Sequence, residues 1–157
     1  MGQKVNLNIN LFYISNNKTN SDHEKKLLRR LKAPIKISLT RISVKKKFKS
    51  KFEQIEYEAK LLGSKIDLSK PFICFDRRGR KFSTIDFAKF LIKLNTETSL
   101  IIGGALGLSE HLKKQSKEII SLSDMEFSHE VFRIMVLEQL YRVSCVINNH
   151  PYQQIEK

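Results

Sequence analysis

The residues that build metal centres, disulfide frameworks and membrane spans are scarce in this chain. Its 157 residues include two cysteines, four histidines and no tryptophan. Cys74 and Cys145 lie in apolar stretches without the spacing of metal ligands, which favours buried free thiols in a reducing compartment. No apolar run approaches the roughly 20 residues that a membrane span needs, and the first ten residues lack the apolar core of a signal peptide. We therefore expect a cytoplasmic protein that has no membrane partner and binds no metal.

Acidic residues are scarce in the N-terminal half. Residues 1–81 contain 21 Lys and Arg against 7 Asp and Glu, whereas residues 82–157 contain 8 against 9, so the formal net charge of +13 arises in the first half. Clusters at 45–47 and 77–81 favour a polyanionic partner, because each phosphate contact releases condensed counterions. A solvated basic face is the alternative. An anionic membrane surface is less favoured, because no helix combines a basic face with exposed bulky apolar residues.

A regular alternation of strand and helix patterns runs through the whole chain. Apolar residues at every second position predict strands near 5–14 and 34–44, and short apolar runs predict strands near 71–75, 98–102 and 119–122. Apolar residues at spacings of three and four predict helices near 21–31, 48–62, 83–94, 109–118 and 128–147, with serine starts expected at Ser21, Ser83 and Ser128. Five strands alternating with five helices predict one α/β domain over residues 1–157, built on a doubly wound, mainly parallel sheet.

Glycine is also scarce, and three of the six glycines lie in "GGALG", residues 103–107, directly after the expected fourth strand. Ligands bind at the carboxyl ends of parallel strands. The candidate ligand loops are therefore this turn, "FDRRG" at 75–79 and "LSDMEF" at 122–127. We expect Gly103 and Gly104 to permit positive φ and to let a ligand approach the backbone; a simple tight turn is the alternative. The G-x-G-x-x-G, Walker and serine-elbow patterns of other α/β enzymes are absent.

Three sequence blocks carry a family resemblance. "LIIGGALGLS", "SLSDMEFSHEVFRIMVLEQLYR" and "INNHPY" resemble the C-terminal half of SPOUT methyltransferases of the RlmH (YbeA-like) type, which methylate N3 of a pseudouridine in large-subunit ribosomal RNA. The resemblance is strong from about Phe72 to Tyr152. It implies a C-terminal trefoil knot that binds S-adenosyl-L-methionine within about 72–152. It also implies a homodimer whose partner is ribosomal RNA, free or in the large subunit or 70S ribosome. The broadly apolar last helix, which suits burial on two sides, agrees with a dimer.

The resemblance also implies which residues hold the cofactor, and the chemistry of the reaction and the basic clusters add further candidates. The expected cofactor contacts lie in the three loops: Phe75, Gly103, Leu122, Ser123, Asp124, Met125, Glu126 and Phe127. The catalytic candidates around the target base are Arg142, which is expected to stabilise developing imide charge, His150 and Tyr152. The candidates for RNA phosphates are Lys45, Lys46, Lys47, Arg77, Arg78, Arg80 and Arg133. For Arg133 and Arg142 the alternative is a salt bridge on the helix surface or across a dimer. Several positions depart from the family pattern. Leucine is usual at Phe75, a more polar pair at Ala105 and Leu106, proline at Ser128, and a histidine at Gln153 after the tyrosine.

Two other functions are compatible with the residues alone. A non-catalytic RNA-binding or ribosome-assembly protein on a nucleotide-binding α/β fold explains the charge but leaves the three loops unexplained. A different α/β enzyme that uses another nucleotide explains the loops but not the three matching blocks. Binding of S-adenosylmethionine, compared with binding of NAD or ATP, distinguishes these alternatives.

Overall fold

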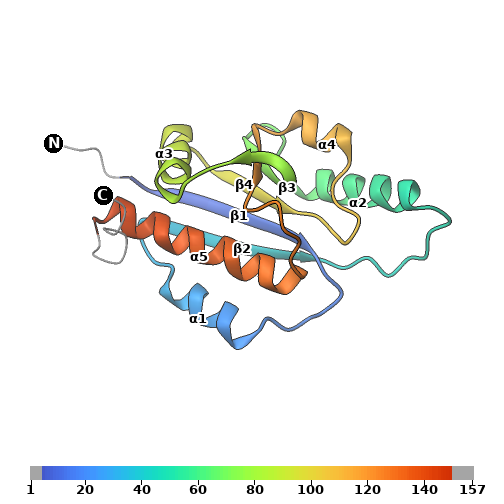
Figure 1. The fold of residues 1–157 in the computed structure, drawn as a ribbon, viewed down its shortest axis with the longest axis horizontal. Coiled ribbons are helices and arrows are strands. Elements are labelled where there is room, and N and C mark those ends of the chain that lie inside the picture. Colours follow the sequence, from blue (N-terminus) through green and yellow to red (C-terminus); the bar gives the residue numbers. More distant parts are fainter. Residues whose placement is uncertain (1–4, 150–157) are drawn as a thin grey trace.

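One five-stranded sheet forms the centre of the molecule (Figure 1). The computed structural model describes residues 5–149. The strands are β1 (Leu7–Ile14), β2 (Ile35–Ile42), β3 (Phe72–Lys81), β4 (Thr98–Ile102) and β5 (Glu118–Ser121). The helices are α1 (Asp22–Arg30), α2 (Lys51–Lys65), α3 (Thr84–Leu94), α4 (Glu110–Gln115) and α5 (His129–Ile147). Strands and helices alternate strictly, as the periodicity predicts.

The sheet is parallel at every pairing, and its strand order is β2-β1-β4-β3-β5. One hydrophobic cluster joins the sheet to α1, α3 and α5, and a second joins its other face to α2 and α4. Helix α5 packs between α1 and α3 (Figure 1). Strand β4 is buried at all five positions, as expected for a parallel strand that is covered on both faces. The predicted α/β class with a doubly wound sheet is confirmed; the trefoil knot stays a prediction.

Serine side chains begin all five described helices. Each serine oxygen accepts a hydrogen bond from the backbone N–H three residues further on, which satisfies one of the helix's free N-terminal donors. In α1 the cap is reciprocal, because the Glu24 side chain also accepts from the backbone N–H of Ser21. The capping serines are Ser21, Ser50, Ser83, Ser109 and Ser128. The helices expected near 21, 83, 109 and 128 begin where predicted, whereas α2 begins at Lys51, after its cap Ser50, and not near residue 48.

Strand β3 is longer than the sequence pattern predicts. The expected strand ends at Phe75, yet extended backbone continues to Lys81. Ile120 of β5 pairs first with Phe75 and then with Arg80, so residues 76–79 leave the ladder and the pairing resumes beyond them. A Cβ on Gly79 would lie only 2.6 Å from the carbonyl oxygen of Ile119. A glycine at this position thus lets the two backbones approach closely enough for pairing to resume, which the apolar pattern could not reveal.

The region around α4 also differs from the prediction. Helix α4 ends at Gln115, and β5 begins at Glu118 rather than at residue 119. The expected helix is too long because the backbone N–H of Lys117 already donates to the carbonyl of Phe72 in β3. Both cysteines are free and buried, as expected. Among the described helices, none has both the length and the apolar character that crossing a membrane requires.

Candidate functional site

An open cleft of about 750 Å³ lies where the chain leaves β4 and β5, beside the segment of β3 that leaves the ladder. Its lining comes from the three loops that the sequence singles out, together with residues of α2, of α4 and of the start of α5. Seven of the eight predicted cofactor residues lie here: Phe75, Gly103, Leu122, Ser123, Met125, Glu126 and Phe127. Asp124 is not part of the lining, and its exposed carboxylate accepts a hydrogen bond from Lys81 Nζ at 2.5 Å. The topology thus brings the three candidate loops together.

The glycine turn of residues 103–107 has a different physical basis from the expected one. Of its three glycines only Gly107 has a positive φ, of 84°, so the expectation of positive φ at Gly103 and Gly104 is wrong. A Cβ on Gly103 would lie 2.9 Å from the side chain of Leu108, and a Cβ on Gly104 would lie 2.9 Å from Oε1 of Glu58. Close packing beneath the turn, rather than backbone dihedral angles, therefore disfavours a side chain at Gly103 and Gly104.

Ser121, Ser123 and two ion pairs hold the loop at 122–127, one of them the Lys81–Asp124 pair. Ser121 Oγ donates to the carbonyl of Ser123 at 3.0 Å, and the N–H of Met125 donates to Ser123 Oγ at the same distance. Glu126 pairs with Arg77 at 3.0 Å, which ties this loop to the β3 segment. Met125 is 74% exposed. The loop therefore has a defined backbone while it presents an apolar side chain at the cleft.

A charged pair fixes the β3 side of the cleft. Burial alone would raise the pKa of Asp76, but hydrogen bonds from the Arg78 N–H at 2.8 Å and from Lys113 Nζ at 3.1 Å hold it below its usual value. Burial likewise opposes the charge on Lys113, yet its contacts with Glu110 and Asp76 raise its pKa. Both groups are therefore charged at neutral pH. Asp76 carries no proton that it could donate as a general acid.

A cysteine nucleophile and a metal centre find no support in the described residues. Burial raises the pKa of Cys74 to about 12, so its thiol stays protonated and is a poor nucleophile. Between residues 5 and 149, no group of three or more His, Cys, Asp or Glu side chains is placed to hold a metal ion. The cleft instead offers apolar walls, backbone groups and a few fixed charges, which is the usual make-up of a small-molecule site.

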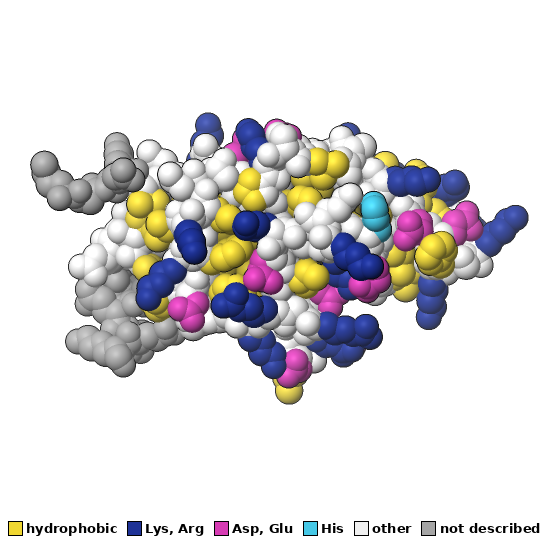
Figure 2. All heavy atoms as spheres, turned by 90° about the horizontal axis from the view of Figure 1, so that it is seen from above, with side chains coloured by type: hydrophobic (Ala, Val, Ile, Leu, Met, Phe, Trp, Pro, Cys, Tyr) yellow, Lys and Arg dark blue, Asp and Glu magenta, His cyan; other side chains and the backbone are white. Residues whose placement is uncertain are grey.

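Six of the seven predicted RNA-binding residues are exposed: Lys45, Lys46, Lys47, Arg77, Arg78 and Arg80. Figure 2 shows Lys and Arg side chains spread over one face with hydrophobic side chains between them. Lys46 Nζ lies 5.1 Å from the ring centre of Tyr57, a cation–π arrangement that leaves the ammonium group at the surface. Arg80 Nη1 lies 3.5 Å from Glu118 and is largely exposed. These residues are placed where a phosphate can reach them.

Arg133 does not fit the predicted phosphate contact. It is only 5% exposed. Its Nε and Nη2 donate to the two carboxylate oxygens of Glu24 at 3.2 Å each, and its guanidinium lies 4.7 Å from the ring centre of Tyr13. Glu24 is fully buried in α1, so the pair joins α1 to α5 inside the hydrophobic core. The correction is that Arg133 is a buried structural residue in this fold, because its donors face a carboxylate rather than solvent.

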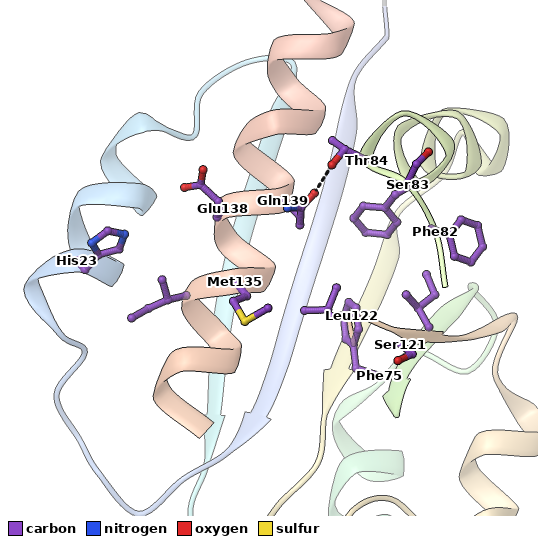
Figure 3. Close-up of a pocket in the computed structure, with 13 residues that line it drawn as sticks. His23, Phe75, Phe82, Ser83, Thr84, Ser121, Leu122, Met135, Glu138 and Gln139 are labelled. Carbon is purple, nitrogen blue, oxygen red and sulfur yellow. Dashed lines mark hydrogen bonds between the residues drawn. The ribbon is translucent and has the colours of Figure 1, made fainter. Parts of the chain in front are cut away.

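Arg142 is half-buried and close to a second cavity. Its Nε donates to Glu138 Oε1 at 3.1 Å along α5. Glu138 lines a cavity of about 360 Å³ between α5 and the start of α3, where Thr84 Oγ1 donates to Gln139 at 2.7 Å (Figure 3). The other catalytic candidates, His150 and Tyr152, lie outside the described residues, as does Gln153.

The two cavities share part of their walls. Phe75 and Leu122 line both the cleft and the second cavity, and in Figure 3 they lie opposite Met135 of α5. The ring of Phe75 also contacts that of Phe132 in an edge-to-face arrangement, with the ring centres 5.7 Å apart. A phenylalanine at position 75 is thus accommodated by a neighbouring aromatic ring on α5.

The prediction missed Glu58. This glutamate of α2 is 3% exposed, and its Oε1 has no hydrogen-bond partner within the described residues. It lies three residues after Ile55 and four before Leu62, and therefore on the apolar stripe of its helix. A charged residue on such a stripe is the signal that could have identified it. Phe52, which the same periodicity places in the core, is 73% exposed and lines the cleft.

Comparison with known proteins finds a matching family and similar relatives. The family described as predicted SPOUT methyltransferase matches residues 7–153. "Ribosomal RNA large subunit methyltransferase H" of Pseudothermotoga lettingae is 35% identical over 131 residues, covering 82% of this chain and 86% of the relative. The protein of the same name from Maridesulfovibrio salexigens is 31% identical, covering 66% of this chain and 69% of its own length. Among solved structures, the SpoU methyltransferase AviRb of Streptomyces viridochromogenes in complex with AdoMet matches with a TM-score of 0.41 and 14% identity. The match covers 90% of this chain and 59% of AviRb.

Proposed function

Since this chain belongs to the SPOUT methyltransferase family, and within it to the RlmH type, we propose that it transfers a methyl group from S-adenosyl-L-methionine to N3 of a pseudouridine in large-subunit ribosomal RNA. The observation that carries this proposal is the meeting of three loops, distant in sequence, around one cleft. We further propose that residues 1–157 act as a single cytoplasmic domain.

The cleft suits S-adenosylmethionine in size and in chemistry. Its volume of about 750 Å³ lies within the range of typical small-molecule sites. Apolar side chains such as Phe75 and Leu122 can enclose a flat purine. Beneath the glycine turn, Glu58 presents a buried oxygen without a donor. An unpaired buried acceptor is costly and commonly marks a functional site.

The reaction asks mainly for alignment by the protein. The bound cofactor supplies a methyl group that its sulfonium already activates. Phe75, Gly103 and the loop at 122–127 would hold this cofactor, and holding reactants in line can supply most of a rate enhancement. Arg142 would stabilise negative charge on the imide of the base; its Nε donates to Glu138, which lines the cavity that shares a wall with the cleft. His150 and Tyr152 complete the proposed catalytic set.

We propose that RNA phosphates are bound by Lys45, Lys46, Lys47, Arg77, Arg78 and Arg80, the exposed members of the predicted set. Replacing Lys45, Lys46 and Lys47 together by glutamine is expected to reduce the salt dependence of RNA binding by about one logarithmic unit for each phosphate that the variant no longer binds. The measurement is the slope of log K against log salt concentration. The matched control replaces three exposed lysines elsewhere, Lys89, Lys93 and Lys114, and should leave the slope unchanged. An equal slope for both triple variants removes residues 45–47 from the interface.

We also propose that the protein acts as a homodimer that pairs through the region of the cleft and α5. Large apolar side chains are exposed there: Phe52 at 73%, Met125 at 74%, Phe127 at 38% and Val131 at 44%. Exposed apolar groups gathered in one region are typical of an interaction surface. A monomeric mass in light scattering, at concentrations where methyl transfer is measured, contradicts this proposal.

The experiment that tests the function combines binding with mapping of the product. Calorimetry with S-adenosylmethionine, NAD and ATP separates a methyltransferase from an enzyme that uses another nucleotide. Methylation mapping of ribosomal RNA from a deletion strain then identifies the modified nucleotide, and incubation with naked RNA, large subunits or 70S ribosomes identifies the substrate. Binding of RNA without S-adenosylmethionine binding would instead support the non-catalytic RNA-binding alternative.

A further inference from the structure

The carboxylate of Glu58 is buried directly beneath the glycine turn. A Cβ built on Gly104 would lie 2.9 Å from Oε1 and 3.2 Å from Oε2 of Glu58, so the carboxylate occupies the space that a side chain at position 104 would take. Oε2 accepts a hydrogen bond from Gln54 Nε2 at 3.1 Å, whereas Oε1 has no partner among the described residues. The absence of a side chain at Gly104 thus allows a charged group to contact the turn from below.

Donors are present in the same turn. The turn closes through a hydrogen bond from the N–H of Gly107 to the carbonyl of Gly104 at 3.0 Å. The backbone N–H groups of Ala105 and Leu106, between these glycines, have no acceptor in the described part of the chain. An unpaired buried acceptor therefore lies next to a turn that has unpaired donors. Leaving the acceptor unpaired costs free energy, and a hydrogen bond from the turn would recover it.

We propose that Glu58 is a positioning residue for the cofactor: its carboxylate accepts a hydrogen bond from a backbone N–H of the turn and thereby holds residues 103–107 in the conformation that binds S-adenosylmethionine. This inference rests on the proposed function. Glu58 does not line the cleft, so it acts through the turn and not on the ligand. The cofactor favours the paired state because it binds to the turn in that conformation only.

The first test compares Glu58→Gln with wild type in calorimetry. The glutamine keeps the size of the side chain but replaces a charge-assisted acceptor with a weaker one. We expect S-adenosylmethionine to bind about tenfold more weakly, while the ligand-free variant unfolds at the same or a higher temperature, because the buried charge is gone. Glu53→Gln, an exposed position of the same helix, is the matched control and should bind as wild type does. Unchanged affinity in Glu58→Gln overturns the inference.

A second ligand distinguishes positioning from direct attraction. 5′-Methylthioadenosine retains the nucleoside but lacks the sulfonium charge and the amino acid. If Glu58 acts through the turn, Glu58→Gln weakens binding of both ligands by the same factor. If only S-adenosylmethionine binding is weakened, the carboxylate attracts the ligand's charge and the inference is wrong. If wild type binds neither ligand, the proposed function fails, and this inference falls with it.

The turn itself can be observed by hydrogen exchange. In wild type and in Glu53→Gln, saturating S-adenosylmethionine should slow exchange of the amides at 104–106, and in Glu58→Gln this protection should be reduced. Gly104→Ala provides a second variant, since its Cβ displaces the carboxylate, and it should also weaken binding. The double variant Glu58→Ala/Gly104→Ala removes that clash. If it binds the cofactor as tightly as wild type does, Glu58 only fills space and the inference is overturned.

Discussion

Replacing Arg133 by methionine is expected to lower the free energy of unfolding by about 3–5 kcal/mol, the usual cost of removing one partner of a buried ion pair. The guanidinium is buried and donates to both carboxylate oxygens of Glu24 at 3.2 Å. Without Arg133 that carboxylate stays inside the core with no counter-charge. Urea unfolding followed by circular dichroism measures the change. Arg30→Met, an exposed position at the end of α1, is the control and should change stability by less than about 0.5 kcal/mol.

The double variant Glu24→Gln/Arg133→Met tests whether the loss of stability in Arg133→Met comes from the unpaired charge of Glu24. Because it leaves no unpaired charge, it should recover much of the loss, and the difference from the sum of the single variants measures the coupling. The structural role is contradicted if Arg133→Met is as stable as wild type and lowers the salt dependence of RNA binding. Arg133 would then contact phosphate, as the sequence alone suggests.

Replacing Gly103 by valine is expected to weaken S-adenosylmethionine binding more than a hundredfold. A Cβ at this position would lie 2.9 Å from Leu108, a buried side chain, and 3.1 Å from the carbonyl carbon of Gly107. The turn must therefore move, and the branched side chain has few rotamers with which to relieve the clash. Calorimetry measures the affinity, and circular dichroism shows whether the sheet still forms.

Gly63→Val is the matched control for Gly103→Val. A Cβ at Gly63, in α2, meets no other atom within 4 Å. Affinity for the cofactor should therefore match wild type, and stability should change by only a few tenths of a kcal/mol. A folded Gly103→Val protein that binds S-adenosylmethionine normally would show that this glycine serves the turn alone and contributes nothing to the cleft.

Local patterns in the chain were sufficient to identify the three loops that line the candidate cleft. The candidate loops follow from strand ends that can be read from apolar runs, and seven of eight named cofactor residues line one cleft. Asp124 was included because it lies within the loop, yet its carboxylate faces Lys81. Periodicity describes which face of an element a residue occupies, and it carries no information about which distant residue lies opposite. Arg133 was therefore assigned to RNA although it lies against Glu24, 109 residues away in the chain.

The sequence by itself determined the alternation of five strands and five helices, the starts of α1, α3, α4 and α5, and the basic N-terminal half, because each depends on residues close together in the chain. Only the tertiary structure decided the strand order β2-β1-β4-β3-β5, the resumption of β3 pairing beyond Phe75, and the burial of Glu24, Glu58 and Arg133. These features arise from contacts between distant segments. Their free energy depends on how whole elements pack against one another, and no local pattern of residues encodes it.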